Sequence, residues 1–383
     1  MTALRICVVT GTRADYGLLR PVMRALDAAE DFKLLTVATG AHLSPEFGMT
    51  VEAIEEDGFE VTDRIEMLLS SDSPVGLSTS TGLATIGMAG VLQRLRPDLV
   101  MVLGDRYEIL AIVQAALIAK VPVAHLSGGD ITEGAIDDAI RHAVTKLSHL
   151  HFVTNEESAQ RVIQMGEDPN HVVVAGNPGL DELLVFEPMR RSELEAALGL
   201  EMRPMNLLIT YHPATLAQER PAEAFVELLA ALDALGGDVG LIFTLPNADT
   251  DGRVLIRLIH DFVEFRPHAV THTSLGQRAY WSCLKAVDAV VGNSSSGLSE
   301  APAVGVVAVN IGERQRGRLR APSVIDCPAE AAAITTALKR ALEQGPVARS
   351  SPYGDGDAAP RILRKLRGVD DPQGLLVKRF HST

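Results

Sequence analysis

Short apolar runs rich in β-branched residues alternate along the chain with longer segments of helical periodicity. In the first half, these runs predict strands at residues 4–9, 34–38, 99–103, 121–125, 151–153 and 172–175. Helices are predicted between them at residues 16–27, 81–95, 107–118, 137–147 and 156–165. Strands that are short and continuously apolar are typical of a parallel sheet covered by helices on both faces. The repeated strand–helix–strand order therefore predicts an open, doubly wound α/β sheet.

A second series of the same kind follows a break in the pattern. After Asn177-Pro178 the alternation is lost over a stretch that contains Pro188, Pro204 and one short helical segment at residues 192–198. It then restarts, with strands predicted at residues 207–210, 239–244, 286–291 and 306–311 and helices at residues 221–235, 253–264, 329–344 and 360–368. We therefore predict two Rossmann-like, doubly wound domains with an interdomain cleft. Their predicted extents are residues 1–176 and 177–355, with residues 356–383 as a C-terminal helix and tail that pack back on the first domain.

Length and composition agree with two domains and narrow the class of partner. A chain of 383 residues, 46% of them apolar, is too long for one ordinary hydrophobic core. The net charge of −14 opposes non-specific adhesion to nucleic acid or to acidic membranes. Arginines and backbone amides that converge locally can still bind a polyanion. We therefore expect no nucleic-acid and no membrane partner, whereas a nucleotide is compatible with the charge.

The start of the chain and its cysteines indicate a cytoplasmic protein. Met1 leads directly into the first predicted strand, without the basic and apolar regions of a signal peptide. We also expect no membrane span, because no apolar stretch approaches the roughly 18 residues that a span needs. Cys7, Cys283 and Cys327 match no metal-ligand spacing and no even disulfide framework, and Cys7 is interpreted as a small core residue.

Small, polar or charged residues follow the predicted strands. Ligands of doubly wound sheets bind beyond the carboxyl ends of the strands, where helix N-termini offer free N–H groups. In the first half these positions are residues 10–17, 104–106 and 125–130, and in the second half they are residues 211–213, 245–247, 292–297 and 312–314. A purely structural protein does not need such residues at every strand end, so the pattern predicts a ligand site along this edge.

The segment 292–297, Gly-Asn-Ser-Ser-Ser-Gly, opens a helix that carries Glu300. Its backbone N–H groups and the hydroxyls of Ser294, Ser295 and Ser296 suit a diphosphate, and Glu300 can accept hydrogen bonds from ribose hydroxyls. The structural alternative is an ordinary N-cap, for which one serine would suffice. Because the segment offers more donors than a cap needs, we predict an anion site here.

Three arginines and one histidine stand close behind strand ends. Arg13, Arg106 and Arg314 occupy equivalent topological positions, and each can contribute a charge-assisted bond of about 1.5–3 kcal/mol to a phosphate. A lone exposed arginine is usually a solvated charge, but three at such positions in an acidic chain favour binding. His212 follows a buried strand, so it is either a histidine satisfied at the strand end or a proton donor to a leaving diphosphate.

Acidic residues concentrate between residues 130 and 142. A helix that begins near Asp137 places Asp138 and His142 on one face, and Asp137 and Arg141 also share a face. The structural alternative is a helix start, because the helix dipole favours acidic residues in the first turn. Carboxylates crowded at one cleft wall would instead split their pKa values and supply an acid and a base. The carboxylates that we expect there are Asp105, Asp130, Glu133, Asp137 and Asp138.

Several common sites are not predicted. The sequence has no recognisable metal motif, P-loop or nucleophilic serine elbow, and Gly11 and Gly17 lack the spacing of the dinucleotide fingerprint. As a set, the motifs resemble the hydrolysing UDP-N-acetylglucosamine 2-epimerase family, in the bacterial branch that serves sialic and legionaminic acid synthesis. The resemblance is carried, in family order, by residues 11–17 (GTRADYG), 104–106 (GDR), 128–129 (GG), 136–142 (IDDAIRH), 212–213 (HP), 246–247 (PN), 292–297 (GNSSSG) and 310–315 (NIGERQ).

The resemblance implies a fold of the glycosyltransferase-B type, no metal, no bound cofactor, and usually a homodimer or homotetramer. It also implies that the second domain binds UDP and that the first domain carries the catalytic carboxylates. The candidate catalytic residues are Asp105, Asp130, Glu133, Asp137 and His212. The candidate substrate-binding residues are Arg13, Gly17, Arg106, Arg141, His142, His212, Asn247, Ser294, Ser295, Ser296, Gly297, Glu300 and Arg314.

The chain departs from the resemblance at one corner. Part of the family has a glutamate where this chain has Ser127, and the loop before Asp137 is one residue longer here. Either Asp130 or Glu133 then supplies the second acid, or the substrate differs at this corner.

The implied reaction agrees with the chemistry of these residues. No carbonyl activates the C2–H of a nucleotide sugar, so cleavage of the anomeric C1–O bond has to acidify it first. Three functions are therefore weighed. The first is epimerisation of UDP-N-acetylglucosamine to N-acetylmannosamine and UDP, the second is the same reaction on a UDP-2,4-diacetamido-2,4,6-trideoxy sugar, and the third is a glycosyltransferase with the same UDP site.

Overall fold

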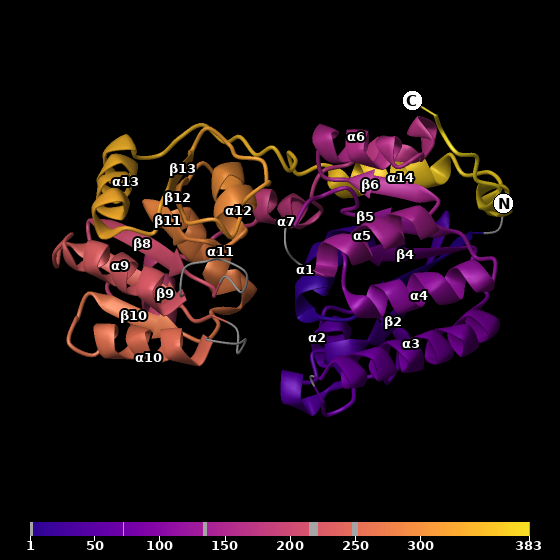
Figure 1. Cartoon of the computed structure of the whole chain (residues 1–383), viewed down its shortest axis with the longest axis horizontal. Helices are drawn as coiled ribbons and strands as arrows, with labels where there is room; N and C mark the ends of the chain where they lie inside the picture. Colours follow the sequence, from indigo (N-terminus) through magenta and orange to yellow (C-terminus); the bar gives the residue numbers. More distant parts are fainter. Residues whose placement is uncertain (1–2, 72, 133–135, 214–220, 247–251, 383) are drawn as a thin grey trace. The chain divides into compact units, whose positions relative to one another are not determined.

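The computed structural model of the chain describes residues 3–71, 73–132, 136–213, 221–246 and 252–382. The chain divides into two compact units, Met1–Glu182 together with Tyr353–Thr383, and Leu183–Pro352. The first unit therefore contains segments from both ends of the sequence. Figure 1 shows the yellow C-terminal helix α14 (Ala358–Arg367) among the indigo and magenta elements of this unit.

Seven parallel strands form the sheet of the first unit, in the order β3-β2-β1-β4-β5-β6-β7. They are β1 (Leu4–Thr10), β2 (Phe32–Thr39), β3 (Val61–Ile65), β4 (Leu99–Leu103), β5 (Val123–Leu126), β6 (Leu150–Val153) and β7 (Val172–Val174). The helices that alternate with them are α1 (Arg13–Asp27), α2 (Val51–Glu56), α3 (Pro74–Leu95), α4 (Tyr107–Ile118), α5 (Ile136–Leu147) and α6 (Glu156–Gln164). The strand order reverses between β1 and β4, so the loops after these two strands adjoin at the switch point where such sheets bind ligands.

Strand β1 sends alternate side chains into two cores. Ile6 and Val8 join the cluster that includes residues of α1 and α14, whereas Cys7 and Val9 join the cluster that includes residues of α3, α4 and α5. All four side chains are fully buried, as expected for a strand covered on both faces. Burial, with a smaller contribution from Asp63, raises the pKa of the Cys7 thiol to about 12. The complete burial of Cys7 agrees with its interpretation as a small core residue.

Helix α14 packs against α1 in the first unit. Its residues Ile362 and Leu363 belong to the same core cluster as Ile6. The carboxylate of Asp181 accepts hydrogen bonds from the backbone N–H groups of Ala358 (3.0 Å) and Ala359 (2.7 Å) at the start of the helix. Because these N–H groups have no partner within the helix, the carboxylate caps its N-terminus.

Helix α3 corrects the expectation that no apolar stretch reaches the length of a membrane span. It has 22 residues, and an 18-residue window within it has a mean hydropathy of 1.4, which suffices by length and composition. Its Gly, Ser and Thr residues interrupt every purely apolar run without adding charge, which is why the sequence pattern concealed it. Met88, Val91 and Leu92 of α3 lie in the core of the first unit. Core helices of soluble proteins satisfy the same criterion, so the helix is weak evidence for a span.

The second unit has a six-stranded parallel sheet in the order β10-β9-β8-β11-β12-β13. Its strands are β8 (Met205–Thr210), β9 (Val239–Thr244), β10 (Ala269–His272), β11 (Ala289–Gly292), β12 (Val307–Ile311) and β13 (Val324–Cys327). Its helices are α8 (Arg191–Leu198), α9 (Pro221–Asp233), α10 (Gly252–Val263), α11 (Gly276–Ala286), α12 (Ser296–Val304) and α13 (Ala331–Gln344), and α7 (Gly179–Val185) lies at the boundary between the units. The strand order reverses between β8 and β11, so both sheets confirm the prediction of two doubly wound, Rossmann-like folds.

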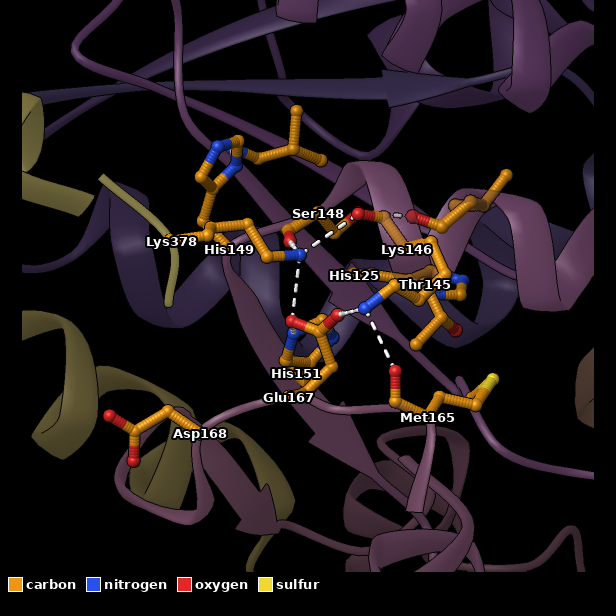
Figure 2. A network of polar contacts seen from close by, with 12 residues as sticks. His125, Thr145, Lys146, Ser148, His149, His151, Met165, Glu167, Asp168 and Lys378 are labelled. Carbon is orange, nitrogen blue, oxygen red and sulfur yellow. Dashed lines mark hydrogen bonds and ion pairs between the residues drawn. The ribbon is translucent and has the colours of Figure 1, made fainter. Parts of the chain in front are cut away.

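An ionic cluster ties the C-terminal tail to the rest of the first unit (Figure 2). Its centre is Glu167, whose side chain is 2% exposed. The carboxylate pairs with Lys146, with Lys378 (2.7 Å) and with the ring of His151 (3.0 Å). Burial alone would raise the pKa of Glu167, but hydrogen bonds from these three groups outweigh it and lower the pKa to about 2. We call these four residues the Glu167 cluster.

Buried histidines make the stability of the first unit sensitive to acid. Burial lowers the pKa of His125 to about 3 and that of His149 to about 4, from 6.5. Both rings therefore stay neutral in the native state, while the unfolded chain takes up protons below pH 6.5. Each group removes about 1.4 kcal/mol of stability per pH unit as the pH falls from 6.5 toward the native value.

We therefore expect the urea midpoint of unfolding to fall steadily between pH 7 and pH 4.5. Glu167 acts in the same direction at lower pH, because its depressed pKa contributes stability above pH 4.5 that is lost as the pH approaches 2. Urea titrations at pH 7, 6, 5.5 and 4.5, in buffers of equal ionic strength, measure the effect. A midpoint that is constant or rises over this range would contradict the assignment of neutral buried rings.

Candidate active site

The loop after β1 presents Arg13 at the start of α1. Thr12 is the N-cap of this helix, and the carboxylate of Asp15 accepts hydrogen bonds from the backbone N–H groups of Gly11 (2.8 Å) and Thr12 (2.7 Å). This capping box fixes the turn and leaves the Arg13 side chain exposed. Gly17 lies half-buried in the second turn of α1.

The loop after β4, which adjoins the loop after β1, contains Asp105 and Arg106. Arg106 is the N-cap residue of α4, and its Nε donates a hydrogen bond to Oε1 of Glu108 at 2.6 Å. Glu108 is 1% exposed, and a Cβ atom added to Gly11 would come within 2.9 Å of its Cγ. The sequence reading missed Glu108, although the spacing Arg-x-Glu at a helix start is a signal that could have found it. Its carboxylate fixes the guanidinium of Arg106 at the strand ends.

Arg141 is the centre of the acidic segment. The side chain is 5% exposed, and it pairs with the carboxylate of Asp105, which lies in the loop after β4. It also donates hydrogen bonds to the backbone carbonyl of Asp130 (2.8 Å) and to Oγ1 of Thr132 (3.0 Å). Asp138 lies 3.6 Å from the same guanidinium. The predicted meeting of Asp105 with the helix 137–147 therefore takes place through a buried cation.

The remaining acidic side chains of this segment differ in their surroundings. Asp138 lies 3.4 Å from His142 one turn later, as the helical spacing predicted. Asp137 is half-buried in the first turn of α5, and no ion pair or hydrogen bond joins its side chain to the residues that the structure describes. The carboxylate of Asp130 accepts hydrogen bonds from Thr154 (3.0 Å) and Ser158 (2.6 Å) at the start of α6. These contacts join Asp130 to the start of α6.

The glycine pair before Asp130 is explained by close packing. Gly129 has φ +78°, and a Cβ atom there would lie 2.3 Å from the backbone oxygen of Ser158. Gly128 faces the ring of His125, whose Nδ1 would be 3.0 Å from an added Cβ. Ser127, where part of the resembling family has glutamate, adopts a left-handed backbone conformation with φ +63°. Glu133, the other candidate for the second acid, lies outside the described residues.

In the second unit, Asn293 joins the ends of neighbouring strands β8 and β11. Its side-chain amide accepts a hydrogen bond from the backbone N–H of His212 (2.7 Å) and donates one to the carbonyl of His212 (2.8 Å). The carbonyl of Asn293 accepts hydrogen bonds from Nη1 of Arg314 (2.9 Å) and from Nε2 of Gln315 (2.8 Å). This buried asparagine therefore links His212 to Arg314, two residues that were predicted separately. Its role was not predicted, because the contacts join residues 81 positions apart.

Helix α12 begins with the predicted serines. Ser295 is exposed, Ser294 is half-buried, and Ser296 is buried with its hydroxyl 2.6 Å from that of Tyr280. Glu300 accepts a hydrogen bond from Nε1 of Trp281 at 3.2 Å. Only part of the serine set is thus open at the helix N-terminus, where backbone N–H groups favour an anion.

Two details complete this second group of residues. Gly292 has φ +132°, and a Cβ atom there would lie 2.0 Å from the carbonyl oxygen of Thr210. Only glycine allows β11 to turn into the serine segment so close to β8. Gly297 lies buried in the first turn of α12, and Asn247 lies outside the described residues.

Comparison with known proteins places the chain in a family. Residues 24–367 match the UDP-N-acetylglucosamine 2-epimerase family. The GDP/UDP-N,N'-diacetylbacillosamine 2-epimerase (hydrolyzing) of Campylobacter jejuni is 39% identical over 85% of both chains. The UDP-N,N'-diacetylbacillosamine 2-epimerase (hydrolyzing) of Legionella pneumophila is 35% identical over 95% of this chain and 96% of its own.

Solved structures show the same fold at lower identity. The UDP-GlcNAc 2-epimerase of Neisseria meningitidis, bound to UDP-GlcNAc, aligns with a TM-score of 0.73 and 19% identity over 95% of this chain and all of its own. The family match spans strands β2 to β13 and separates the chain from the glycosyltransferases that were weighed as an alternative. The chain belongs to the UDP-N-acetylglucosamine 2-epimerase family and is a hydrolysing UDP-sugar 2-epimerase.

Proposed function

We propose that the chain hydrolyses and epimerises a UDP-linked 2,4-diacetamido-2,4,6-trideoxy sugar, releasing UDP and the free 2-epimer. The observation that carries this choice is the order of identities among relatives. Two relatives named for N,N'-diacetylbacillosamine, a sugar of this class, are 39% and 35% identical. A relative named UDP-N-acetylglucosamine 2-epimerase is 28% identical over 96% of this chain. Ser127, in place of a larger acidic residue, is compatible with a sugar that differs at this corner.

In this proposal, UDP binds the second unit. The diphosphate accepts hydrogen bonds from the N-terminus of α12, from the hydroxyls of Ser294 and Ser295, and from Arg314. His212 donates a hydrogen bond to the leaving phosphate, and Glu300 accepts one from the ribose. These groups stabilise the charge that develops when the anomeric C1–O bond breaks, and each aligned donor is worth about 3–4 kcal/mol.

The sugar chemistry is assigned to the first unit. As UDP leaves, positive charge on the ring acidifies C2–H, and a carboxylate takes the proton to give a 2-acetamidoglycal. Water then adds at C1, and C2 receives a proton from the opposite face. We assign the acid and base roles to Asp105 and Asp137 without fixing their order. Asp105 is paired with Arg141, which fixes the position of its carboxylate.

The test compares substrates directly. The purified chain is incubated without acceptor in D2O with the UDP-linked diacetamido sugar, its GDP-linked counterpart, and UDP-N-acetylglucosamine. The proposal predicts the highest kcat/KM for the UDP-diacetamido sugar, with release of UDP and incorporation of one deuterium at C2. Preferred turnover of UDP-N-acetylglucosamine to N-acetylmannosamine would support the second candidate. Release of UDP with a retained C2 hydrogen would contradict the elimination itself.

Replacement of Asn293 by alanine should weaken UDP binding about tenfold. Loss of the two hydrogen bonds that hold His212 costs about 1–3 kcal/mol, and 1.4 kcal/mol corresponds to a factor of ten in Kd. The single tryptophan, Trp281, contacts Glu300 and provides a fluorescence signal for UDP titration.

Asn206 is a matched control for this variant. Its side chain makes the same reciprocal pair, with the N–H (2.9 Å) and carbonyl (2.8 Å) of Arg203, at the opposite end of β8. Asn206→Ala should lower stability but leave the Kd for UDP unchanged. Equal effects of the two variants on Kd would argue against a UDP site at Asn293.

A further inference from the structure

His125 is a fully buried histidine at the end of β5, directly behind the loop that carries Asp105. Its Nε2 lies 2.8 Å from the backbone oxygen of Gly104, and its Nδ1 lies 3.2 Å from Oγ1 of Thr145 on α5. Both contacts are made by the imidazole ring, so neither belongs to the backbone hydrogen bonding of a strand or helix. The imidazole therefore bridges the β4 loop and the helix that carries Arg141.

The two contacts determine which ring nitrogen carries the proton. A backbone carbonyl only accepts hydrogen bonds, so Nε2 has to be the protonated, donating nitrogen. Nδ1 then has a free lone pair and accepts the hydrogen bond from the Thr145 hydroxyl. Both polar atoms of the ring are satisfied in one neutral tautomer, and burial, which lowers the pKa of His125 to about 3, keeps the ring in that state.

The atom that receives this hydrogen bond lies next to a candidate catalytic residue. Gly104 has φ +85°, in the left-handed region, where the chain leaves β4. Its N–H donates to the carbonyl of Leu126 (3.0 Å), and its carbonyl accepts the hydrogen bond from His125. Residues of β5 therefore bind the peptide groups on both sides of Gly104. Asp105 follows immediately, and its carboxylate is held from the other direction by Arg141. Arg141 and Thr145 are one turn apart on α5, so the same helix contacts both the Asp105 carboxylate and the His125 ring.

We propose that His125 is a positioning residue that sets the place of the Asp105 carboxylate through the Gly104 carbonyl. This inference rests on the proposed function for the role of Asp105 in proton transfer. The ring itself does not touch substrate. Its effect is on geometry, and a displacement of about 1 Å at a reacting group can cost about 10²-fold in rate.

Two substitutions of nearly equal volume isolate the hydrogen bond. His125→Gln retains an N–H at the position of Nε2, whereas His125→Met fills the same space without a donor. We expect His125→Met to lower kcat about 10²-fold, with KM and the Kd for UDP unchanged, and His125→Gln to recover most of the loss. Thr145→Val, which removes the hydroxyl that fixes the tautomer, should give a smaller loss in kcat of the same kind.

His149 provides the control for a purely structural role. It is likewise buried, and its Nδ1 accepts a hydrogen bond from the backbone N–H of Val123 (3.1 Å), away from the β4 loop. His149→Met should lower the melting temperature but leave kcat unchanged. Equal loss of kcat in His125→Met and His149→Met, or loss without recovery in His125→Gln, would overturn the inference.

Hydrogen exchange gives a readout that does not depend on activity. Mass spectrometry of the peptide that covers residues 103–107 should show faster amide exchange in His125→Met than in wild type, and nearly wild-type exchange in His125→Gln and His149→Met. Unchanged exchange in His125→Met would overturn the inference. A wild-type enzyme that turns over none of the nucleotide sugars would contradict the proposed function, while the exchange data would still decide on the role of His125.

Discussion

Asp137→Asn should reduce kcat by about 10²–10⁴-fold while the Kd for UDP stays at its wild-type value. Asp137 lies half-buried in the first turn of α5, so its carboxylate is accessible and near donors that stabilise a negative charge. Asparagine keeps the shape but cannot accept or return the C2 proton. Free sugar measured by chromatography gives kcat, and Trp281 fluorescence gives the affinity for UDP.

Asp105→Asn is the informative comparison. Asp105 pairs with the buried Arg141, so its replacement should lower both kcat and the melting temperature, whereas Asp137→Asn should lower kcat alone. Deuterium at C2 in residual product would show whether proton exchange or the later addition of water is slowed. Loss of UDP affinity in Asp137→Asn would show that its role is structural and would remove it from the acid–base pair.

The inner strands of both sheets were predictable because burial on two faces leaves continuous apolar runs. The strand predicted at residues 99–103 matches β4 and the strand predicted at residues 239–244 matches β9. The strands that were missed are β3, β10 and β13, and each lies at an edge of its sheet. An edge strand has one neighbour and partial exposure, so polar residues such as those of β3 (VTDRI) interrupt the apolar run that marks an inner strand.

The candidate site shows a similar division. Polar residues at strand ends, such as Asp105, Arg106 and His212, were recognised because their position alone suggests a ligand. The buried groups that hold them, Glu108, His125 and Asn293, were missed. In isolation each is an ordinary polar residue beside a strand, and its contacts join segments far apart in sequence, as His125 and Gly104 do over 21 positions.

Arg141 shows what the sequence could not supply. The spacing on α5 predicted that it shares a face with Asp137, but its ion pairs are with Asp105 and Asp138. Helical spacing gives neighbours on one helix and carries no information on the element packed against it. The same limit applies to Lys378, which contacts the carbonyl of Ser148 from 230 positions away (2.6 Å).

Glu167→Gln should destabilise the first unit by about 1.5–3 kcal/mol. The carboxylate is 2% exposed and is the common partner of Lys146, Lys378 and His151. Removing its charge leaves two partly exposed ammonium groups without their anion, and the loss of hydrogen bonds between charged groups costs about this much. Urea unfolding, followed by circular dichroism, measures the change. The C-terminal tail, anchored by Lys378, should also become susceptible to proteolysis.

Glu157→Gln is the matched control for the same change of side chain. Glu157 is 56% exposed and pairs with Arg161 one turn later on α6. Such exposed pairs contribute about 0.3–0.5 kcal/mol, so its loss should be nearly silent. Lys378→Met should recover part of the stability lost in Glu167→Gln, because the double variant has one unpaired cation fewer beside the buried position 167. Equal small effects of Glu167→Gln and Glu157→Gln would mean that water compensates the lost ion pairs of the Glu167 cluster. The tail would then be held by its other contacts, such as the cation–π contact of Phe380 with Lys146.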